Sequence, residues 1–209
     1  MNKGKFIYLA FVLVAVFSAS AGFFLWQATQ KAQPPQQATL LVLPEAREIP
    51  AFSLVDQDGA AFGLEQLKGK WSLLFFGFTH CPDICPGTLY ELSQLDRQIA
   101  ASGGDPSRHQ VLFVSVDPER DTPQRLKDYV AYFSPEFIAV TGEHGALVPL
   151  TRKLGIAYRI AEHEEGAADY SVDHSASILL VNPDGRLHGV FPSPHDVPAM
   201  ADEMQKLLN

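Results

Sequence analysis

Apolar residues in the first half of the chain follow two different periods. Residues 71–78 and 111–116 are nearly continuous apolar runs, which are typical of strands buried on both faces. Between them, apolar side chains recur every three or four residues over 88–100, which predicts a helix. After Asp121-Thr122-Pro123 a second helix is predicted, because a capping side chain precedes a proline in its first turn. The pattern therefore indicates strand, helix, strand, helix.

Shorter elements continue this alternation to the end of the chain. They are a strand at 137–140, a helix at 147–154 that stops at Gly155, a strand–turn–strand hairpin at 177–191 and a final helix at 196–208. Parallel connections through helices bury a sheet between helical layers. The sequence thus predicts one α/β domain of the thioredoxin type, over residues 44–209, without an internal repeat.

The amino-terminal part has a different pattern. No charged residue occurs from Phe6 to Trp26, and a helix of that length rises about 30 Å, enough to cross a bilayer. The alternative is a cleaved signal peptide ending at Ala19-Ser20-Ala21, but the sequence stays apolar beyond that point, which favours a retained anchor. Lys3 and Lys5 precede the span, so the amino terminus (1–5) is expected to be cytoplasmic.

These features predict a single-pass protein of a bacterial inner membrane, with a transmembrane anchor at 6–26 and its functional domain in the periplasm. Residues 27–43 are rich in glutamine and contain Pro34-Pro35, so we expect a flexible tether there. The chain has 16 basic and 24 acidic residues, a formal charge of −8. Such a balance offers no basic surface for phosphates and argues against nucleic-acid binding. A hydrophobic content of 46% excludes a wholly disordered chain.

The chain has two cysteines, Cys81 and Cys85, and both lie between the first predicted strand and helix. A helix start favours thiolates, because free N–H groups and the helix dipole lower a thiol's pKa. Residues i and i+4 of a helix lie on one face, with Cβ atoms about 5–6 Å apart. Two thiols at that spacing can bind one soft metal ion or form a disulfide.

A third ligand would favour the metal, and His174 is the candidate. It precedes the strand of the terminal hairpin, where thioredoxin-like proteins place a cis-proline against their cysteine pair. Two thiolates and an imidazole suit Cu(I), and can hold Cu(II) with an additional weak ligand, whereas structural zinc would need a fourth strong ligand. His80 is adjacent to Cys81 but is expected to point away from it along the chain. The other histidines are interpreted as surface or loop residues: His109, His144, His163, His188 and His195.

Other polar and sulfur side chains near these segments have structural interpretations. Asp83 is either a helix cap or a group that contacts the metal or a partner, and Asp173 either orients His174 or faces solvent. The acidic residues of 117–123 are expected to fix a turn and a cap. Met200 and Met204 are expected in the core. Two aromatic residues are expected to line the site, Phe78 and Tyr158.

Three segments resemble the signature motifs of the Sco/SenC family: Cys81-Pro82-Asp83-Ile84-Cys85-Pro86, residues 117–123 (DPERDTP) and residues 170–175 (YSVDHS). The resemblance covers roughly Ile49 to Leu207. It implies a membrane-anchored, thioredoxin-like copper protein that helps to assemble the copper centre of cytochrome c oxidase. It also implies copper ligation by Cys81, Cys85 and His174. The implied partners are the copper-accepting oxidase subunit and an upstream periplasmic copper donor or thiol reductant.

Two functions stay open at this point. A metallochaperone would bind one copper ion and pass it on by ligand exchange. A thiol-disulfide oxidoreductase would use Cys81 or Cys85 to reduce a disulfide of the oxidase subunit or of another exported protein. His174 discriminates between them, because dithiol exchange does not need an imidazole there. Peroxidase chemistry fits less well, since it needs only one activated thiolate.

Overall fold

The computed structural model describes residues 3–30, 39–164, 166–167 and 169–208. It forms two compact units, 1–37 and 38–209. In the first unit, α1 (Lys3–Gln30) confirms the predicted helix and extends four residues into the segment expected to be a tether. The rest of that segment up to residue 38 lies outside the described residues, and 41–43 belong to a strand.

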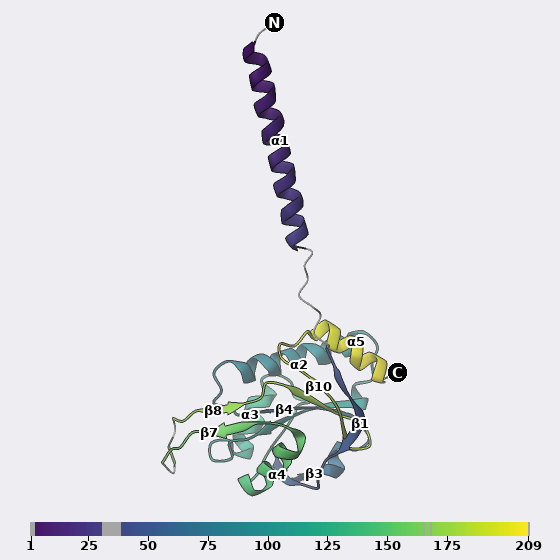
Figure 1. Ribbon diagram of the computed structural model, residues 1–209. Coiled ribbons are helices and arrows are strands. Elements are labelled where there is room, and N and C mark those ends of the chain that lie inside the picture. Colours follow the sequence, from purple (N-terminus) through teal and green to yellow (C-terminus); the bar gives the residue numbers. More distant parts are fainter. Residues whose placement is uncertain (1–2, 31–38, 165, 168, 209) are drawn as a thin grey trace. The chain divides into compact units, whose positions relative to one another are not determined.

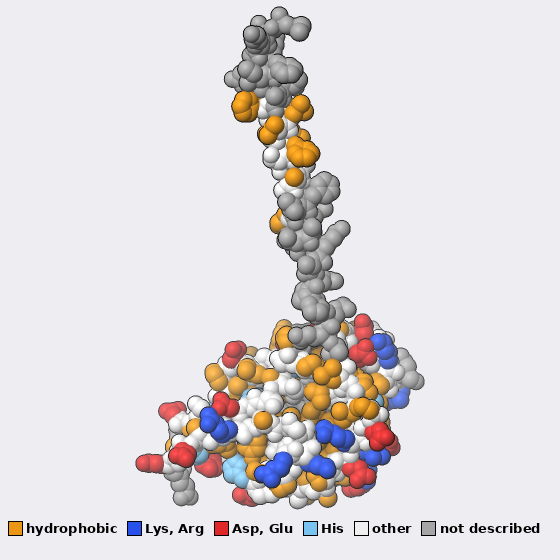
Figure 2. Space-filling view, viewed as in Figure 1, with side chains coloured by type: hydrophobic (Ala, Val, Ile, Leu, Met, Phe, Trp, Pro, Cys, Tyr) orange, Lys and Arg blue, Asp and Glu red, His pale blue; other side chains and the backbone are white. Residues whose placement is uncertain are grey.

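Apolar side chains surround the described turns of α1, and Phe17, for example, is 77% exposed (Figure 2). Among the residues that the structure describes, no helix is both long and apolar enough to cross a membrane. The prediction of a transmembrane helix at 6–26 is therefore not confirmed.

An eight-stranded sheet forms the centre of the second unit, in the order β1-β10-β9-β4-β5-β6-β2-β3 (Figure 1). Its strands are β1 (Leu41–Glu48), β2 (Ser53–Asp56), β3 (Ala61–Gly63), β4 (Trp71–Gly77), β5 (His109–Ser115), β6 (Ile138–Thr141), β9 (Ile178–Val181) and β10 (Arg186–Phe191). The pairs β4–β5 and β5–β6 are parallel, whereas the other pairings are antiparallel. A separate two-stranded sheet consists of β7 (Tyr158–Ile160) and β8 (Val172–His174).

Helices cover both faces of the main sheet, as the alternation predicted. They are α2 (Ile84–Ala101), α3 (Pro123–Ala131), α4 (His144–Leu154) and α5 (Val197–Leu208). The helices α2 and α5 pack together on one side of the sheet, and α4 lies on the other (Figure 1). Phe75 and Phe76 of β4 are fully buried, and Met200 and Met204 of α5 lie in the core as predicted. The thioredoxin-like α/β fold is thereby confirmed.

Capping residues in the sequence predicted some helix ends more accurately than others. The Thr122 side chain accepts a hydrogen bond from the backbone N–H of Arg125 and caps α3, with Pro123 in the first turn. Gly155 ends α4 in the left-handed conformation, with φ of 76°. By contrast, α2 begins four residues before the predicted start at residue 88. This earlier start brings Cys85 into the helix.

Candidate metal centre

Cys81 and Cys85 lie on either side of the start of α2. Cys85 is in the first turn and is fully buried, whereas Cys81 is in the preceding loop and half-buried. Only Cys85 lies in the helix, so the two cysteines do not share a helix face as expected. The Sγ of Cys81 lies 3.3 Å from the backbone nitrogen of Cys85 and accepts its hydrogen bond. The sulfur thus satisfies an N–H of the helix start, while the side chain of Asp83, at the N-cap position, makes no capping bond.

His174, the last residue of β8, directs its ring toward these cysteines. Its Nε2 lies 3.1 Å from the Sγ of Cys85, and its Nδ1 lies 3.1 Å from the carbonyl oxygen of Ser175. A proton on Nδ1 is satisfied by that carbonyl, which leaves the lone pair of Nε2 directed at the thiols. The two sulfur atoms and the imidazole nitrogen all lie within 4.8 Å of one another.

Aromatic rings fix the orientation of the imidazole. Phe75 and Phe78 both contact the His174 ring edge to face, with centroid distances of 5.9 and 5.7 Å. Tyr158 is the register partner of His174 in the β7–β8 hairpin. The expected role of Phe78 at the site is confirmed, and the contact with Phe75 is an addition that the sequence did not indicate.

Burial has opposite effects on the two kinds of ligand. It raises the pKa of the Cys85 thiol, and it lowers the pKa of His174. The predicted lowering of a thiol pKa at the helix start is therefore wrong for Cys85, because desolvation outweighs the backbone hydrogen bond at Phe78, which lowers the pKa. A metal ion at this site would have to displace the Cys85 proton, whereas His174 already favours the neutral form that binds metals.

Gly77, the last residue of β4, makes room for Cys85. A Cβ atom at this position would lie 2.7 Å from the Cys85 Sγ and 2.8 Å from the ring of Phe113. Any larger residue would force the thiol or the ring to move. The signal was visible in the sequence, because a glycine inside an apolar strand often marks a close approach of other groups. Sequence reasoning did not use it.

Among the described residues, no other histidine joins the group of Cys81, Cys85 and His174, and three of the surface or loop interpretations are wrong. The side chains of His109 and His195 are buried and contact Asp96 and Glu91, each at 2.8 Å. His163 stacks on Tyr170 with ring centroids 3.7 Å apart. Glu91 is 104 positions from His195, whereas Asp96 is 13 positions from His109 and Tyr170 lies on the same loop as His163.

His80 is exposed and belongs to a different group, with Asp117 and Asp121. Both carboxylates are already occupied by protein donors. Asp117 accepts hydrogen bonds from Arg120 and Tyr170, and Asp121 accepts them from Thr79 and Ser115. The interpretation of this segment as a turn rather than an acidic metal site agrees with these contacts. Asp173 is exposed and pairs with Arg159, so it does not contact His174 through its carboxylate.

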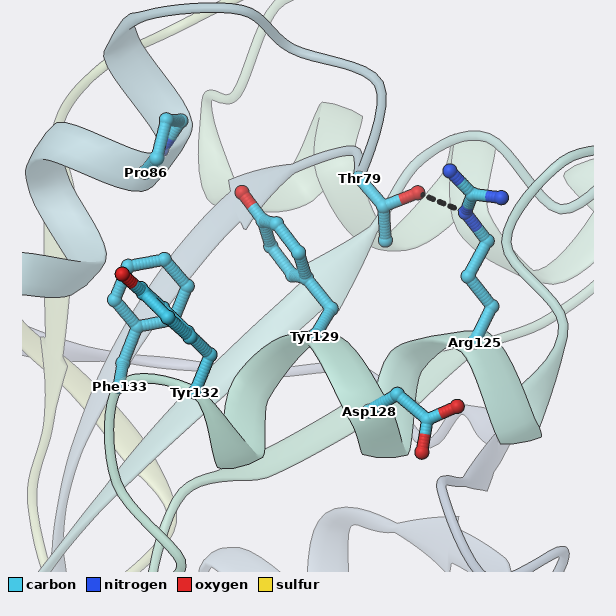
Figure 3. A pocket seen from close by; sticks show the side chains of 7 residues that line it. All are labelled: Thr79, Pro86, Arg125, Asp128, Tyr129, Tyr132 and Phe133. Carbon is cyan, nitrogen blue, oxygen red and sulfur yellow. Dashed lines mark hydrogen bonds between the residues drawn. The ribbon is translucent and has the colours of Figure 1, made fainter.

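A shallow groove lies beside the cysteine loop (Figure 3). It is lined by Thr79, Pro86, Arg125, Asp128, Tyr129, Tyr132 and Phe133. Thr79 and Arg125 close one end of it through a hydrogen bond of 2.7 Å between the Arg125 Nε and the Thr79 Oγ1. Pro86 comes from the first turn of α2, directly after Cys85, but none of the three candidate ligands lines the groove.

The donor set fits a soft metal ion. It consists of two thiols and one neutral imidazole. Within the described residues, no carboxylate and no fourth side chain belongs to this group. Structural zinc normally requires four strong ligands, whereas Cu(I) is satisfied by two or three soft ones. A thioredoxin-like domain with two cysteines and a histidine converging at the start of a helix defines a class of metal-binding or thiol-redox proteins.

The chain belongs to the SCO1/SenC family, which matches residues 43–209. A protein of Stutzerimonas stutzeri that is provisionally named a copper-binding protein is 43% identical over 173 residues, 83% of each chain. The chain covers a smaller share, 44–58%, of mitochondrial Sco relatives from a plant, cattle and yeast.

Solved structures agree with this assignment. The crystal structure of Arabidopsis thaliana ScoI with copper bound is 38% identical, with a TM-score of 0.69 over 76% of this chain and 97% of that one. BsSco, described as a member of the Sco family of cytochrome c oxidase assembly proteins, has a disulfide switch. It is 27% identical, with a TM-score of 0.61 over 79% of this chain and 95% of that one.

Proposed function

We propose that this protein is a copper metallochaperone that binds one copper ion through Cys81, Cys85 and His174. It would deliver the ion to the copper-accepting subunit of cytochrome c oxidase. The observation that carries the proposal is the convergence of two sulfur atoms and one imidazole nitrogen within 4.8 Å. The copper bound by the Arabidopsis relative supports copper binding, and the role of the Sco family in oxidase assembly supports delivery to the oxidase.

Three protein ligands suit a metal that must be handed on. Cys85 and His174 are held by core side chains, whereas Cys81 is half-buried and precedes the helix. An incoming thiolate or imidazole of the acceptor can therefore approach copper from the side of Cys81. Ligand exchange then proceeds as one acceptor ligand binds while one ligand of this chain dissociates, with the copper oxidation state unchanged.

A second function, reduction of a partner's disulfide, is supported by the same pair of cysteines. Cys81 and Cys85 are both free thiols and lie close enough for the sulfur of one to contact the backbone of the other. In such a reaction the two thiols become a disulfide, the partner's disulfide becomes two thiols, and the two protons pass from Cys81 and Cys85 to the partner's sulfur atoms. The disulfide switch described for BsSco, a relative in the same family, supports reversible disulfide formation by such a pair.

We further propose that α1 attaches the protein to the inner membrane of a bacterium and that the copper-binding domain lies in the periplasm. The exposed apolar side chains of α1, among them Phe11 and Phe17, support attachment. A periplasmic copper donor or thiol reductant would then act before this protein. Membrane fractionation of the full chain, beside a form that starts at residue 38, tests attachment. Recovery of the full chain without membranes would contradict it.

A competition titration against a Cu(I) chelator tests the ligand set on the reduced full chain. We expect Cys81→Ser, Cys85→Ser and His174→Ala each to lower copper affinity by more than the roughly 10–100-fold loss that is typical when a residue hydrogen-bonded to a metal ligand is replaced. His80→Ala is the matched control, because His80 lies next to Cys81 but outside the group. Circular dichroism checks the fold of each variant.

Replacement of His174 distinguishes the two functions. In the His174→Ala variant, copper binding should fail while the Cys81–Cys85 dithiol still exchanges with an added disulfide. Parent-like copper affinity in the folded variant would contradict the copper-binding proposal and favour the oxidoreductase.

A further inference from the structure

The strand that carries His174 is not part of the main sheet. Within the described residues, β8 pairs only with β7. The main-sheet ladder therefore does not position the histidine, in contrast to the cysteines at the junction of β4 and α2. The chain continues into β9 four residues after His174, and the imidazole also has a backbone hydrogen bond at Phe76; side-chain contacts supply the remaining links between this hairpin and the domain.

Arg120 supplies several of these contacts. Its guanidinium lies 3.5 Å from the centre of the Tyr170 ring and 5.6 Å from that of Phe78, so it lies against both rings. It also donates a hydrogen bond of 3.1 Å to the Tyr170 carbonyl, two residues before β8. Its Nε lies 2.6 Å from the carboxylate of Asp117, which is completely buried.

Tyr170 connects this pair to the rest of the hairpin. Its hydroxyl donates to Asp117, and its ring stacks on His163 with an interplanar angle of 11°. His163 in turn lies 3.0 Å from Glu119. The segment 117–120 therefore holds the connection between β7 and β8 near both of its ends.

The adjoining residue, Asp121, holds the cysteine loop. Its carboxylate accepts a hydrogen bond of 2.9 Å from the backbone N–H of Thr79 and another from the Thr79 hydroxyl. Thr79 lies two residues before Cys81, and Arg125 binds its hydroxyl from the other side (Figure 3). One segment, 117–121, thus contacts the elements that carry both kinds of ligand.

We propose that Arg120, together with Asp117 and Tyr170, is a positioning residue that sets the place of the His174 ring relative to the cysteines. This inference rests on the proposed copper function. Arg120 does not ligate copper; it acts through Phe78, whose ring contacts His174, and through the backbone of Tyr170. We call these three residues, Asp117, Arg120 and Tyr170, the clamp. Removing the clamp lowers copper affinity because it releases the histidine, while the cysteines stay in place.

The test uses two variants of the clamp in the full chain. Arg120→Gln combined with Asp117→Asn removes the buried ion pair without leaving one charge unpaired, which would destabilise the fold. Tyr170→Phe keeps the stacked ring and removes only the hydroxyl contact with Asp117. Arg159→Gln is the control, because Arg159 is on the same hairpin but forms an exposed pair with Asp173.

We expect the double variant to bind Cu(I) about 10–100-fold more weakly, Tyr170→Phe less so, and Arg159→Gln like the parent. The decisive comparison repeats the clamp substitutions in His174→Ala. If the clamp acts through His174, they cause no further loss in that background. An equal loss in both backgrounds, or no loss in either, would overturn the inference.

A second readout does not depend on copper. In nuclear magnetic resonance spectra of the reduced, metal-free chain, the His174 ring signals should shift or broaden in the clamp variants and stay unchanged in Arg159→Gln. Unchanged His174 signals in folded clamp variants would contradict the inference. Parent-like copper affinity of His174→Ala alone would instead refute the ligand set of the proposed function, and the two failures are thereby distinguishable.

Discussion

The two sides of the metal centre are built differently. Cys85 lies in the first turn of α2, close to Gly77 and the Phe113 ring. Gly77 is the last residue of β4, a strand that is paired on both sides. His174 lies on a two-stranded hairpin that is separate from the main sheet. Rings and one buried ion pair hold it, rather than a continuous ladder of backbone hydrogen bonds.

This difference assigns different tasks to the two sides. Close-packed cores resist displacement, so the position of Cys85 is determined by the fold itself. Regions with fewer core contacts open at lower free energy. On the histidine side, individual side chains can therefore change the copper affinity without unfolding the domain. The predictions below follow from this comparison, in order of decreasing expected effect.

Oxidation of the cysteine side should abolish copper binding. Copper requires thiolates, and a Cys81–Cys85 disulfide removes both sulfur donors at once. We expect the oxidised chain to take up little Cu(I) in a chelator competition, and to recover full uptake after reduction. Thiol counting verifies complete oxidation. Equal affinity before and after oxidation would place the metal elsewhere.

A methyl group at Gly77 should disturb the cysteine side alone. Gly77→Ala places a Cβ 2.7 Å from the Cys85 Sγ, and overpacking of this kind typically costs about 1–3 kcal/mol. Copper affinity should fall as the sulfur moves. Gly87→Ala is the matched control within α2, because a Cβ there meets no atom within 4 Å.

Thermal unfolding and Cu(I) titration measure both glycine variants. Gly87→Ala should be neutral or stabilising, since alanine is favoured over glycine in a helix. If the two variants were equally stable and bound copper equally well, the close packing of Cys85 would not matter for the site.

The smallest effect concerns pH and the histidine side. Hydrogen bonds to the carbonyl of Ala161 and then to Glu119 raise the pKa of His163, because both ring nitrogens face acceptors. A raised pKa in the folded state stabilises the fold below the unfolded value of about 6.5, and this contribution is lost as pH rises through the folded pKa. Glu119→Gln should therefore lower the melting temperature slightly at acidic pH and have less effect at alkaline pH. A pH-independent difference would contradict this.

Much of the fold was predictable from apolar periodicity. The buried runs became β4 and β5, and the amphipathic stretches became α2 to α5, because burial on one or two faces leaves a clear pattern. The pattern could not reveal β1, whose side chains are mostly exposed, and it could not reveal the short β7 and β8. Those strands depend on pairing with distant partners.

The candidate site shows the same limit. The spacing of Cys81 and Cys85, and the place of His174, were sufficient to predict the group that the structure brings together. The side-chain contacts around it were not predictable. His163 was interpreted as a loop residue, although it stacks on Tyr170, and nothing in the local sequence indicates the position of Arg120 between the Phe78 and Tyr170 rings.

X-ray absorption spectroscopy of the Cu(I)-loaded chain tests the central claim most directly, because it counts the atoms around copper. We predict two sulfur neighbours and one imidazole nitrogen in the parent, and loss of that nitrogen with both sulfurs retained in His174→Ala. A spectrum with the same imidazole contribution in His174→Ala, or without two sulfur neighbours in the parent, would contradict a copper site formed by Cys81, Cys85 and His174.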